Sequence, residues 1–313
     1  MGAINPTDQC QNEQICKLIQ DQATLAANQN TLDANQSKIE GHLCFETGKF
    51  VFVADSGEAN SEQASMSTLL ESIDPDQVFM GGDNVYGGTT ITDALAFLSD
   101  RIDAGQVWPC WGNHDWDDND LDDILAEFPY LPYNKRSYNI HFNKGNLELI
   151  LISNDDSEPD GVAVDGDQYT YIHTAINNST ARWKVAMFHH PPFTPRTNAS
   201  DPAHFRAIMQ DWPGLQEMDL ILVGHGHMAW AANWDATKVI NCSTGVRDLR
   251  PFSVSQTVYG ATEGQAGLLY QGDESGRHLL KLHTSSNRLT AEFLRHEGNP
   301  GSSPLIDYAI DIS

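Results

Sequence analysis

Val78-Phe79-Met80-Gly81-Gly82-Asp83-Asn84-Val85-Tyr86 is the stretch that decides the fold. The run Gln77 to Met80 predicts a buried parallel strand. Gly81 and Gly82 allow a sharp turn and a close approach of the backbone to a ligand. Asp83 therefore follows the carboxyl end of a strand, which is where open α/β sheets hold their binding sites.

Four other apolar runs also end in side chains that can bind a metal. They lead to Asp55-Ser56-Gly57, Gly112-Asn113-His114-Asp115, His189-His190 and Gly224-His225-Gly226-His227. Because the carboxyl ends of parallel strands meet at one edge of a sheet, we expect these side chains to lie together. Carboxylate oxygens mixed with imidazoles suit Fe, Mn or Zn rather than calcium.

In this order the five blocks resemble those of the calcineurin-like metallophosphoesterases, and within them the purple acid phosphatases. The general superfamily has Asp-x-His in its first block, whereas this chain has Asp55-Ser56-Gly57, as purple acid phosphatases do. Tyr86 matches the tyrosine of their Gly-Asp-x-x-Tyr motif. The resemblance runs from Phe50 to the C-terminus. It implies that residues 43–313 form an α/β fold, the four-layer α-β-β-α metallophosphoesterase sandwich. The heptad pattern described below predicts a separate N-terminal helical arm over residues 1–42.

The resemblance also implies two metal ions. The first, Fe3+ in the family, would be held by Asp55, Asp83, Tyr86 and His227. The second, a divalent ion such as Fe2+, Zn2+ or Mn2+, would be held by Asp83, Asn113, His189 and His225. A shared carboxylate is physically reasonable, because it limits the repulsion between two neighbouring cations. Such a pair clamps the attacking and leaving oxygens of an in-line displacement at phosphorus.

His114 is the expected catalytic side chain. It lies beside Asn113 and cannot easily reach the same metal, so it suits contact with the transferred phosphoryl or protonation of the leaving oxygen. Asp115 is expected to orient it. Asn113, His114 and His190 are the expected substrate contacts, although His190 could equally be a packing residue. The segment from Trp116 to Asp123 carries five aspartates and is expected to be a solvated loop.

The expected reaction is hydrolysis of phosphate monoesters. One alternative is a phosphodiesterase that acts on nucleotides or on an envelope polymer. Another is an assembly or virion protein, such as a tail or fibre, that carries a metallophosphoesterase-like head. The complete ligand set and His114 favour an active enzyme.

Residues 1–42 form a segment of different composition. Leu18, Leu25, Leu32 and Ile39 recur every seven residues, and the other core positions of this heptad pattern are Gln22, Gln29 and Gln36. So narrow an apolar stripe predicts a coiled coil, with a trimer through residues 15–39 as the expected homo-oligomer. The alternative is a helix that lies on its own domain, or an unstructured leader.

Charge and hydropathy limit the partners of the chain. The formal net charge is -25, which argues against a protein that binds duplex nucleic acid. The metals must therefore supply the positive charge that attracts a phosphate ester. The sequence has no run of 18 apolar residues and no visible signal peptide, so a partner membrane is not expected. The sequence leaves the location of the protein open, and an extracellular or virion-associated location is compatible with the N-terminal arm.

Overall fold

The computed structural model describes residues 46–118, 121–132, 134–194, 212, 214–245, 249, 266–272, 277–295 and 304–313. The predicted coiled coil lies outside the described residues. The chain divides into Met1–Phe45 and Glu46–Ser313, and the fold below is that of the second unit. Among the described residues, no helix combines the length and the hydropathy that a bilayer crossing requires.

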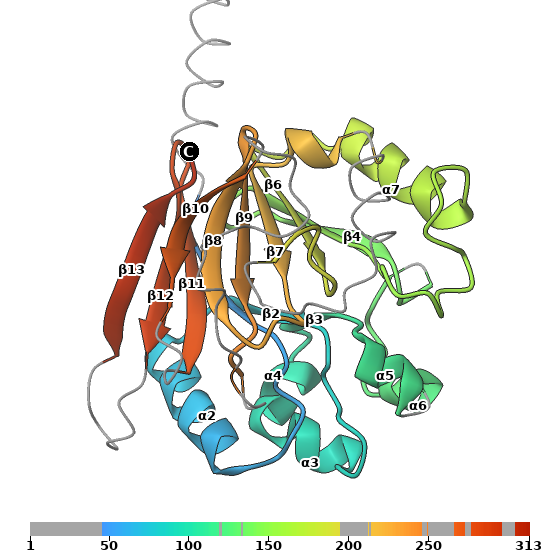
Figure 1. Ribbon diagram of the computed structural model, residues 1–313, viewed down its shortest axis with the longest axis vertical. Helices are drawn as coiled ribbons and strands as arrows, with labels where there is room; N and C mark the ends of the chain where they lie inside the picture. Colours follow the sequence, from blue (N-terminus) through green and yellow to red (C-terminus); the bar gives the residue numbers. More distant parts are fainter. Residues whose placement is uncertain are drawn as a thin grey trace, which may run out of the picture. The chain divides into compact units, whose positions relative to one another are not determined.

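Two β-sheets form the centre of this unit (Figure 1). The first has the order β13-β12-β11-β1-β2-β3. Its strands are β1 (Gly48–Val53), β2 (Gln77–Gly81), β3 (Val107–Cys110), β11 (His278–Thr284), β12 (Leu289–Arg295) and β13 (Leu305–Asp311). The second has the order β10-β8-β9-β7-β6-β5-β4. Its strands are β4 (Tyr138–Phe142), β5 (Leu147–Leu151), β6 (Trp183–Phe188), β7 (Leu220–Val223), β8 (Ala229–Trp234), β9 (Thr237–Cys242) and β10 (Ala266–Gln271).

Parallel pairing in both sheets brings the candidate blocks to matching strand ends. In the first sheet β1, β2 and β3 run parallel. In the second sheet β5, β6, β7 and β9 run parallel. The apolar run before Asp83 therefore forms a parallel strand, β2, between β1 and β3, as predicted.

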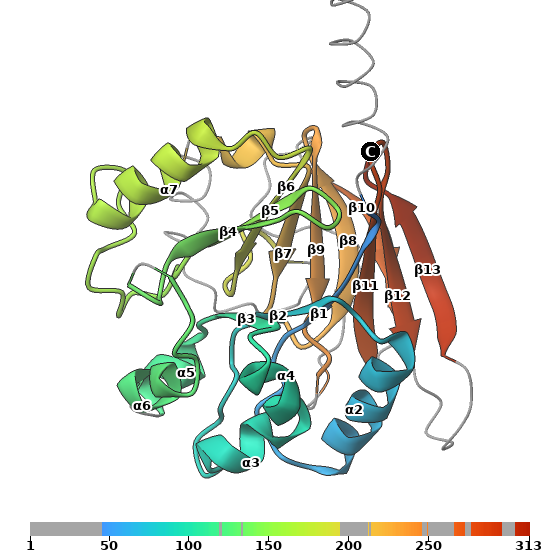
Figure 2. The same ribbon diagram turned by 180° about the vertical axis from the view of Figure 1, so that it is seen from behind.

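Helices cover the outer faces of the two sheets (Figures 1 and 2). The helical segments are α2 (Ser61–Ile73), α3 (Ile91–Leu95), the 3-10 turn η1 (Ala96–Leu98), α4 (Ser99–Asp103), α5 (Asn113–Asp117), α6 (Leu121–Ala126), α7 (Asp167–Asn178) and η2 (Leu215–Glu217). In both views α2, α3 and α4 lie beside the first sheet, and α7 lies on the far side of the second.

Alternating side chains of β5 show how the layers pack. Leu147, Leu149 and Leu151 belong to the main core cluster, whereas Ile150 belongs to a second cluster with Ile172 of α7. Successive residues of a strand point to opposite faces, so one face of β5 meets the other sheet and the other meets a helix. This confirms the expected α-β-β-α sandwich.

Candidate metal centre

The candidate ligands follow five strands, three from the first sheet and two from the second. Asp55 follows β1, Asp83 follows β2 and Asn113 begins α5 after β3. His189 follows β6, and the pair His225 and His227 follows β7. The two sheets are joined at this edge, because His189 Nδ1 lies 2.8 Å from the Gly81 carbonyl oxygen.

Asp83 lies between two groups of potential ligand atoms. One group is Asp83, His189 and His225, and the other is Asp55, Asp83 and His227; within each, the ligand atoms lie within 4.8 Å of one another. A carboxylate that belongs to both groups is the arrangement that a pair of neighbouring cations needs.

Tyr86 and Asn113 lie beside these groups. The Tyr86 hydroxyl donates to Asp55 Oδ1 at 3.3 Å, and Asn113 Oδ1 lies 3.1 Å from His225 Nδ1. The structure therefore brings together all seven residues that the sequence suggested as ligands. That each of them binds a metal remains a prediction.

Four of these residues have a left-handed backbone conformation. The φ angles are 58° at Asp55, 53° at Asp83, 65° at His225 and 53° at His227. Such a conformation costs a non-glycine residue about 1–3 kcal/mol and is concentrated at functional sites. The backbone of this edge is thus strained in the way that directs side chains into a common site.

Two glycines allow the close packing around Asp83 and His189. A Cβ at Gly112 would lie 2.3 Å from Asp83 Oδ1, and a Cβ at Gly82, where φ is 87°, would lie 2.4 Å from His189 Nδ1. Any side chain at either position would displace a candidate ligand.

The electrostatics of Asp83 and His189 favour a bound cation. Burial opposes ionisation of Asp83, but the imidazoles of His189, His114 and His225 hold its pKa below the usual value. Burial also opposes protonation of His189, yet the charge of Asp83 raises its pKa to about 10. The raised pKa reflects the negative potential of the carboxylates around His189, and this potential favours a cation, which would replace the proton. This donor set fits a pair of metal ions.

His114 has a different carboxylate partner from the one expected. Its Nδ1 lies 2.5 Å from Asp118 Oδ2, and Asp118 also accepts from the Gly87 amide at 3.2 Å. The Tyr86 ring packs edge-on against the imidazole, with centroids 4.7 Å apart. The prediction of a solvated loop from Trp116 to Asp123 is wrong where this segment belongs to α5 and α6. Asp118, between the two helices, is exposed as expected, but its carboxylate contacts His114.

Asp115 joins two loops instead. Its fully buried carboxylate accepts from the amides of Asn84, Val85 and Gly112 at 2.9–3.0 Å. Burial, together with the charge of Asp83, raises its pKa to about 7. Asp115 thus holds the loops after β2 and β3 together, and the carboxylate that contacts His114 is that of Asp118.

His190 is a buried member of the site. Its Nε2 lies 3.3 Å from Asp155 Oδ2, and its ring centroid lies 4.6 Å from that of His225. Its backbone is held by Asn154, which both accepts from the His190 amide and donates to its carbonyl. Asp155 and Asn154 are partners that the sequence analysis did not identify. Their position after β5, at the same edge as His189, is the signal that could have found them.

Known proteins share this fold. The family model of calcineurin-like phosphoesterases matches residues 48–229. The structure is similar to purple acid phosphatase PPD1 from seeds of yellow lupin (Lupinus luteus), with a TM-score of 0.58 and 13% identity over 85% of this chain and 53% of that one. It is also similar to GAP50, the anchor in the inner membrane complex of Plasmodium, with a TM-score of 0.56 and 14% identity over 85% and 88% of the two chains.

A third similar structure is that of PhoD, with a TM-score of 0.54 and 12% identity over 84% of this chain and 69% of that one. No curated protein matches the sequence. This chain spans about half of the lupin phosphatase, and identities this low show a common fold alone. The family match covers more than half of the chain and coincides with the five blocks, so the chain belongs to the calcineurin-like phosphoesterase family.

Proposed function

We propose that this chain hydrolyses phosphate monoesters at a pair of metal ions. The observation that carries the proposal is the position of Asp83 in both groups of ligand atoms. The family is one of metal-dependent phosphoester hydrolases. A trivalent ion is assigned to the side of Asp55 and Tyr86, and a divalent ion to the side of His189.

The ions, when bound, would supply positive charge that clamps the attacking and leaving oxygens at phosphorus. The rest is done by the side chains of the chain. Asp83 holds both positions together, and Asn113 presents its amide to the ester. We assign protonation of the leaving oxygen to His114 Nε2, because the other ring nitrogen, Nδ1, contacts Asp118, whose carboxylate stabilises the protonated ring.

The monoester preference rests on the purple acid phosphatase features of the chain, which are Asp55-Ser56-Gly57 and Tyr86. A phosphodiesterase that acts on nucleotides or an envelope polymer is the alternative within the same chemistry. The fold is shared with an anchor protein as well as with phosphatases. An assembly role therefore stays a second candidate, and an assay of hydrolysis separates the two.

Metal analysis with parallel assays tests the proposal. The purified protein should contain two metal ions per chain and cleave p-nitrophenyl phosphate faster than bis(p-nitrophenyl) phosphate. Asp83→Ala should lose metal from both positions and abolish hydrolysis, whereas Asp93→Ala, on the exposed face of α3, should change neither. Full metal content in Asp83→Ala would refute the bridging role, and a faster diester reaction would establish the alternative.

The visible absorption of the iron-loaded protein tests whether Tyr86 binds a trivalent ion at the first metal position. A phenol has a pKa of about 10 in water, so its ionisation near neutral pH requires a strongly acidic cation such as Fe3+ beside it. The iron-loaded protein should show a visible charge-transfer band, and Tyr86→Phe should bleach it without unfolding the chain. A colourless wild type with full iron occupancy, or a coloured Tyr86→Phe variant, would exclude Tyr86 as a ligand.

A further inference from the structure

Glu148 lies in β5, an otherwise apolar and buried strand, near the end of this strand that is away from the candidate metal centre. All five residues of β5 are buried, and Glu148 is the charged one among them. Its carboxylate contacts Asn139 Nδ2 at 2.5 Å and His141 Nδ1 at 3.2 Å, both on β4. Asn139 in turn accepts from the Tyr171 hydroxyl of α7 at 2.8 Å. Burial of a carboxylate is costly unless it is hydrogen-bonded, and Asn139 and His141 provide these bonds to Glu148.

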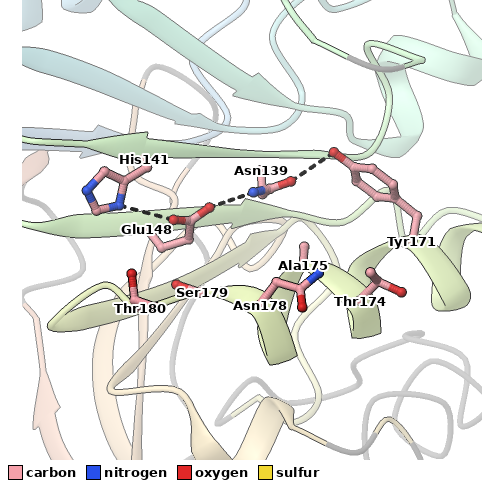
Figure 3. A pocket seen from close by; sticks show the side chains of 9 residues that line it. All are labelled: Asn139, His141, Glu148, Tyr171, Thr174, Ala175, Asn178, Ser179 and Thr180. Atoms are coloured by element: carbon pink, nitrogen blue, oxygen red, sulfur yellow. Dashed lines mark hydrogen bonds and ion pairs between the residues drawn. The ribbon is translucent and has the colours of Figure 1, made fainter.

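The network forms one wall of a hollow of about 500 Å³, within the range of small-molecule sites. Figure 3 shows Glu148, Asn139 and His141 in a row on the strands, with the last turns of α7 and the residues after it facing them. That opposite wall presents hydroxyl and amide groups from Thr174, Asn178, Ser179 and Thr180. Both walls of the hollow therefore carry polar groups.

The charge of the hollow selects a cation. Of the described residues that line it, Glu148 is the carboxylate and none is a lysine or arginine. His141 also lines the hollow, and it neutralises Glu148 only when its ring is protonated. The carboxyl end of α7, the negative end of its dipole, lies on the facing wall, and the last turn of this helix contains no basic residue. Lys184 of β6 approaches the same helix end at the Ile176 carbonyl, 3.5 Å away, but does not line the hollow.

The chemistry of the two walls defines the ligand further. A carboxylate accepts about four hydrogen bonds, and the described contacts of Glu148 use two of them. One carboxylate is too few for a metal site, but it suits the ammonium group of an organic molecule. The hydroxyls and amides around it suit ligand hydroxyls. We propose that this hollow binds a small hydroxylated amine of the size of an amino sugar, with its ammonium on Glu148.

This site is separate from the candidate metal centre. Both adjoin β5 and the residues after it, because Asn154 holds His190 at one end and Glu148 lies at the other. Six residues of extended chain separate them, which corresponds to about 20 Å. Occupation of the hollow should therefore not require metal in the centre.

Glucosamine is the probe for a binding test by ligand-observed NMR and isothermal titration. It should bind the wild type at least about tenfold more tightly than glucose, which lacks the ammonium group for a charge-assisted hydrogen bond. Putrescine, which has ammonium groups but no hydroxyls, should also bind more weakly. Asp83→Ala should leave glucosamine binding unchanged, because the hollow is independent of the metal centre.

Two variants with matched controls locate the binding. Glu148→Gln, which keeps a hydrogen-bond acceptor, should remove the preference for glucosamine, whereas Glu292→Gln on β12, which breaks an ion pair with Lys281, should not. Ala175→Leu should fill the hollow and abolish binding, whereas Asn177→Leu, on α7 but outside the lining, should not. Melting temperatures show that each variant is folded.

Several outcomes would overturn the proposal. No binding of glucosamine to the wild type, or equal binding of glucose, would refute the site for an amine. Equal binding of putrescine would refute the role of the hydroxyls. Binding that survives both Glu148→Gln and Ala175→Leu would place the ligand elsewhere.

Discussion

Asp83 combines features that seldom occur in one residue. Its side chain is almost fully buried, its φ angle is 53°, and its Oδ1 accepts from the His114 amide at 3.0 Å. The same oxygen lies 3.3 Å from His189 Nε2. One carboxylate thus links the loop after β2, the start of α5 and the end of β6, which explains why the sequence around it is rich in glycine.

His114 and Asp118 give a prediction at the same scale. If Asp118 orients His114 as a general acid, both should matter more for esters with poor leaving groups. His114→Ala should lower turnover of an alkyl phosphate by about 10²–10⁴-fold but that of p-nitrophenyl phosphate far less, because nitrophenolate leaves without a proton. Asp118→Asn should show the same dependence on the leaving group in weaker form.

Metal content and a control variant complete this test. Both variants should keep their metals, measured by elemental analysis, and Asp93→Asn should show no dependence on the leaving group. An equal loss for both esters would mean that Asp118 has only a structural role. Loss of metal from His114→Ala would make His114 a ligand.

At the scale of elements, the pair of Asp155 and His190 joins the loop after β5 to the end of β6. Burial lowers the pKa of His190 to about 4. The charges of His225 and His189 also lower this pKa, whereas Asp155 raises it. An unfolded histidine has a pKa of about 6.5. Between these values the unfolded chain binds the proton and the folded chain does not. The stability that His190 contributes is therefore present above pH 6.5 and is lost as the pH falls toward 4.

His190→Phe should remove the loss of stability that protonation of His190 causes at acidic pH. The difference in the free energy of unfolding between wild type and variant should change by about 2 kcal/mol from pH 7 to pH 5. Urea titrations at the two pH values measure it, and any pH effect common to both proteins cancels in the comparison. His283→Phe, at an exposed position of β11, is the control and should keep the wild-type dependence. The same pH dependence in His190→Phe as in wild type would contradict a neutral buried imidazole.

Some of these elements could be predicted from sequence and others could not. Asp55, Asp83 and His189 each follow a short apolar run, which is typical of a buried parallel strand. Because parallel strands end at a common edge of the sheet, the clustering of these candidate ligands was predictable. Asp118 was not, because its role depends on α5, a five-residue helix within a run of aspartates that resembles a solvated loop. The contacts of Asp115 could not be predicted either. Its position next to His114 in the sequence suggested His114 as its partner, but the fold turns the Asp115 carboxylate toward the amides of Asn84 and Val85.

At the scale of the whole molecule, the negative net charge of the chain opposes the approach of an anionic substrate to the candidate site. The chain has a net charge of -25, yet its family acts on phosphate esters, which are anions. Long-range repulsion is screened beyond about 10 Å at 0.1 M salt, so the local charge of a metal pair can still attract a substrate. The acidic surface is compatible with solubility in a concentrated salt medium.

The N-terminal arm gives the prediction at this scale. At the core positions of its heptad pattern, leucine or isoleucine alternates with glutamine, and a single helix with so narrow a stripe has little apolar surface to bury. Association of several copies would bury that stripe, and polar core positions would fix their register. We therefore expect the full chain to form a trimer. Deletion of residues 1–40 should give a monomer with unchanged activity per chain, because the candidate metal centre lies wholly in Glu46–Ser313.

Sedimentation equilibrium of four proteins measures the oligomeric state: the full chain, the deletion and two double variants. Substitution of the core positions, Leu25→Asp with Leu32→Asp, should dissociate the trimer. The same charges at Ala27 and Ala34, on the opposite side of the predicted helix, should leave it intact. If the full chain sediments as a monomer at about micromolar concentration, or if both double variants behave alike, the apolar stripe does not join copies of this chain. Residues 1–42 would then be a helix that lies on its own domain, or an unstructured leader.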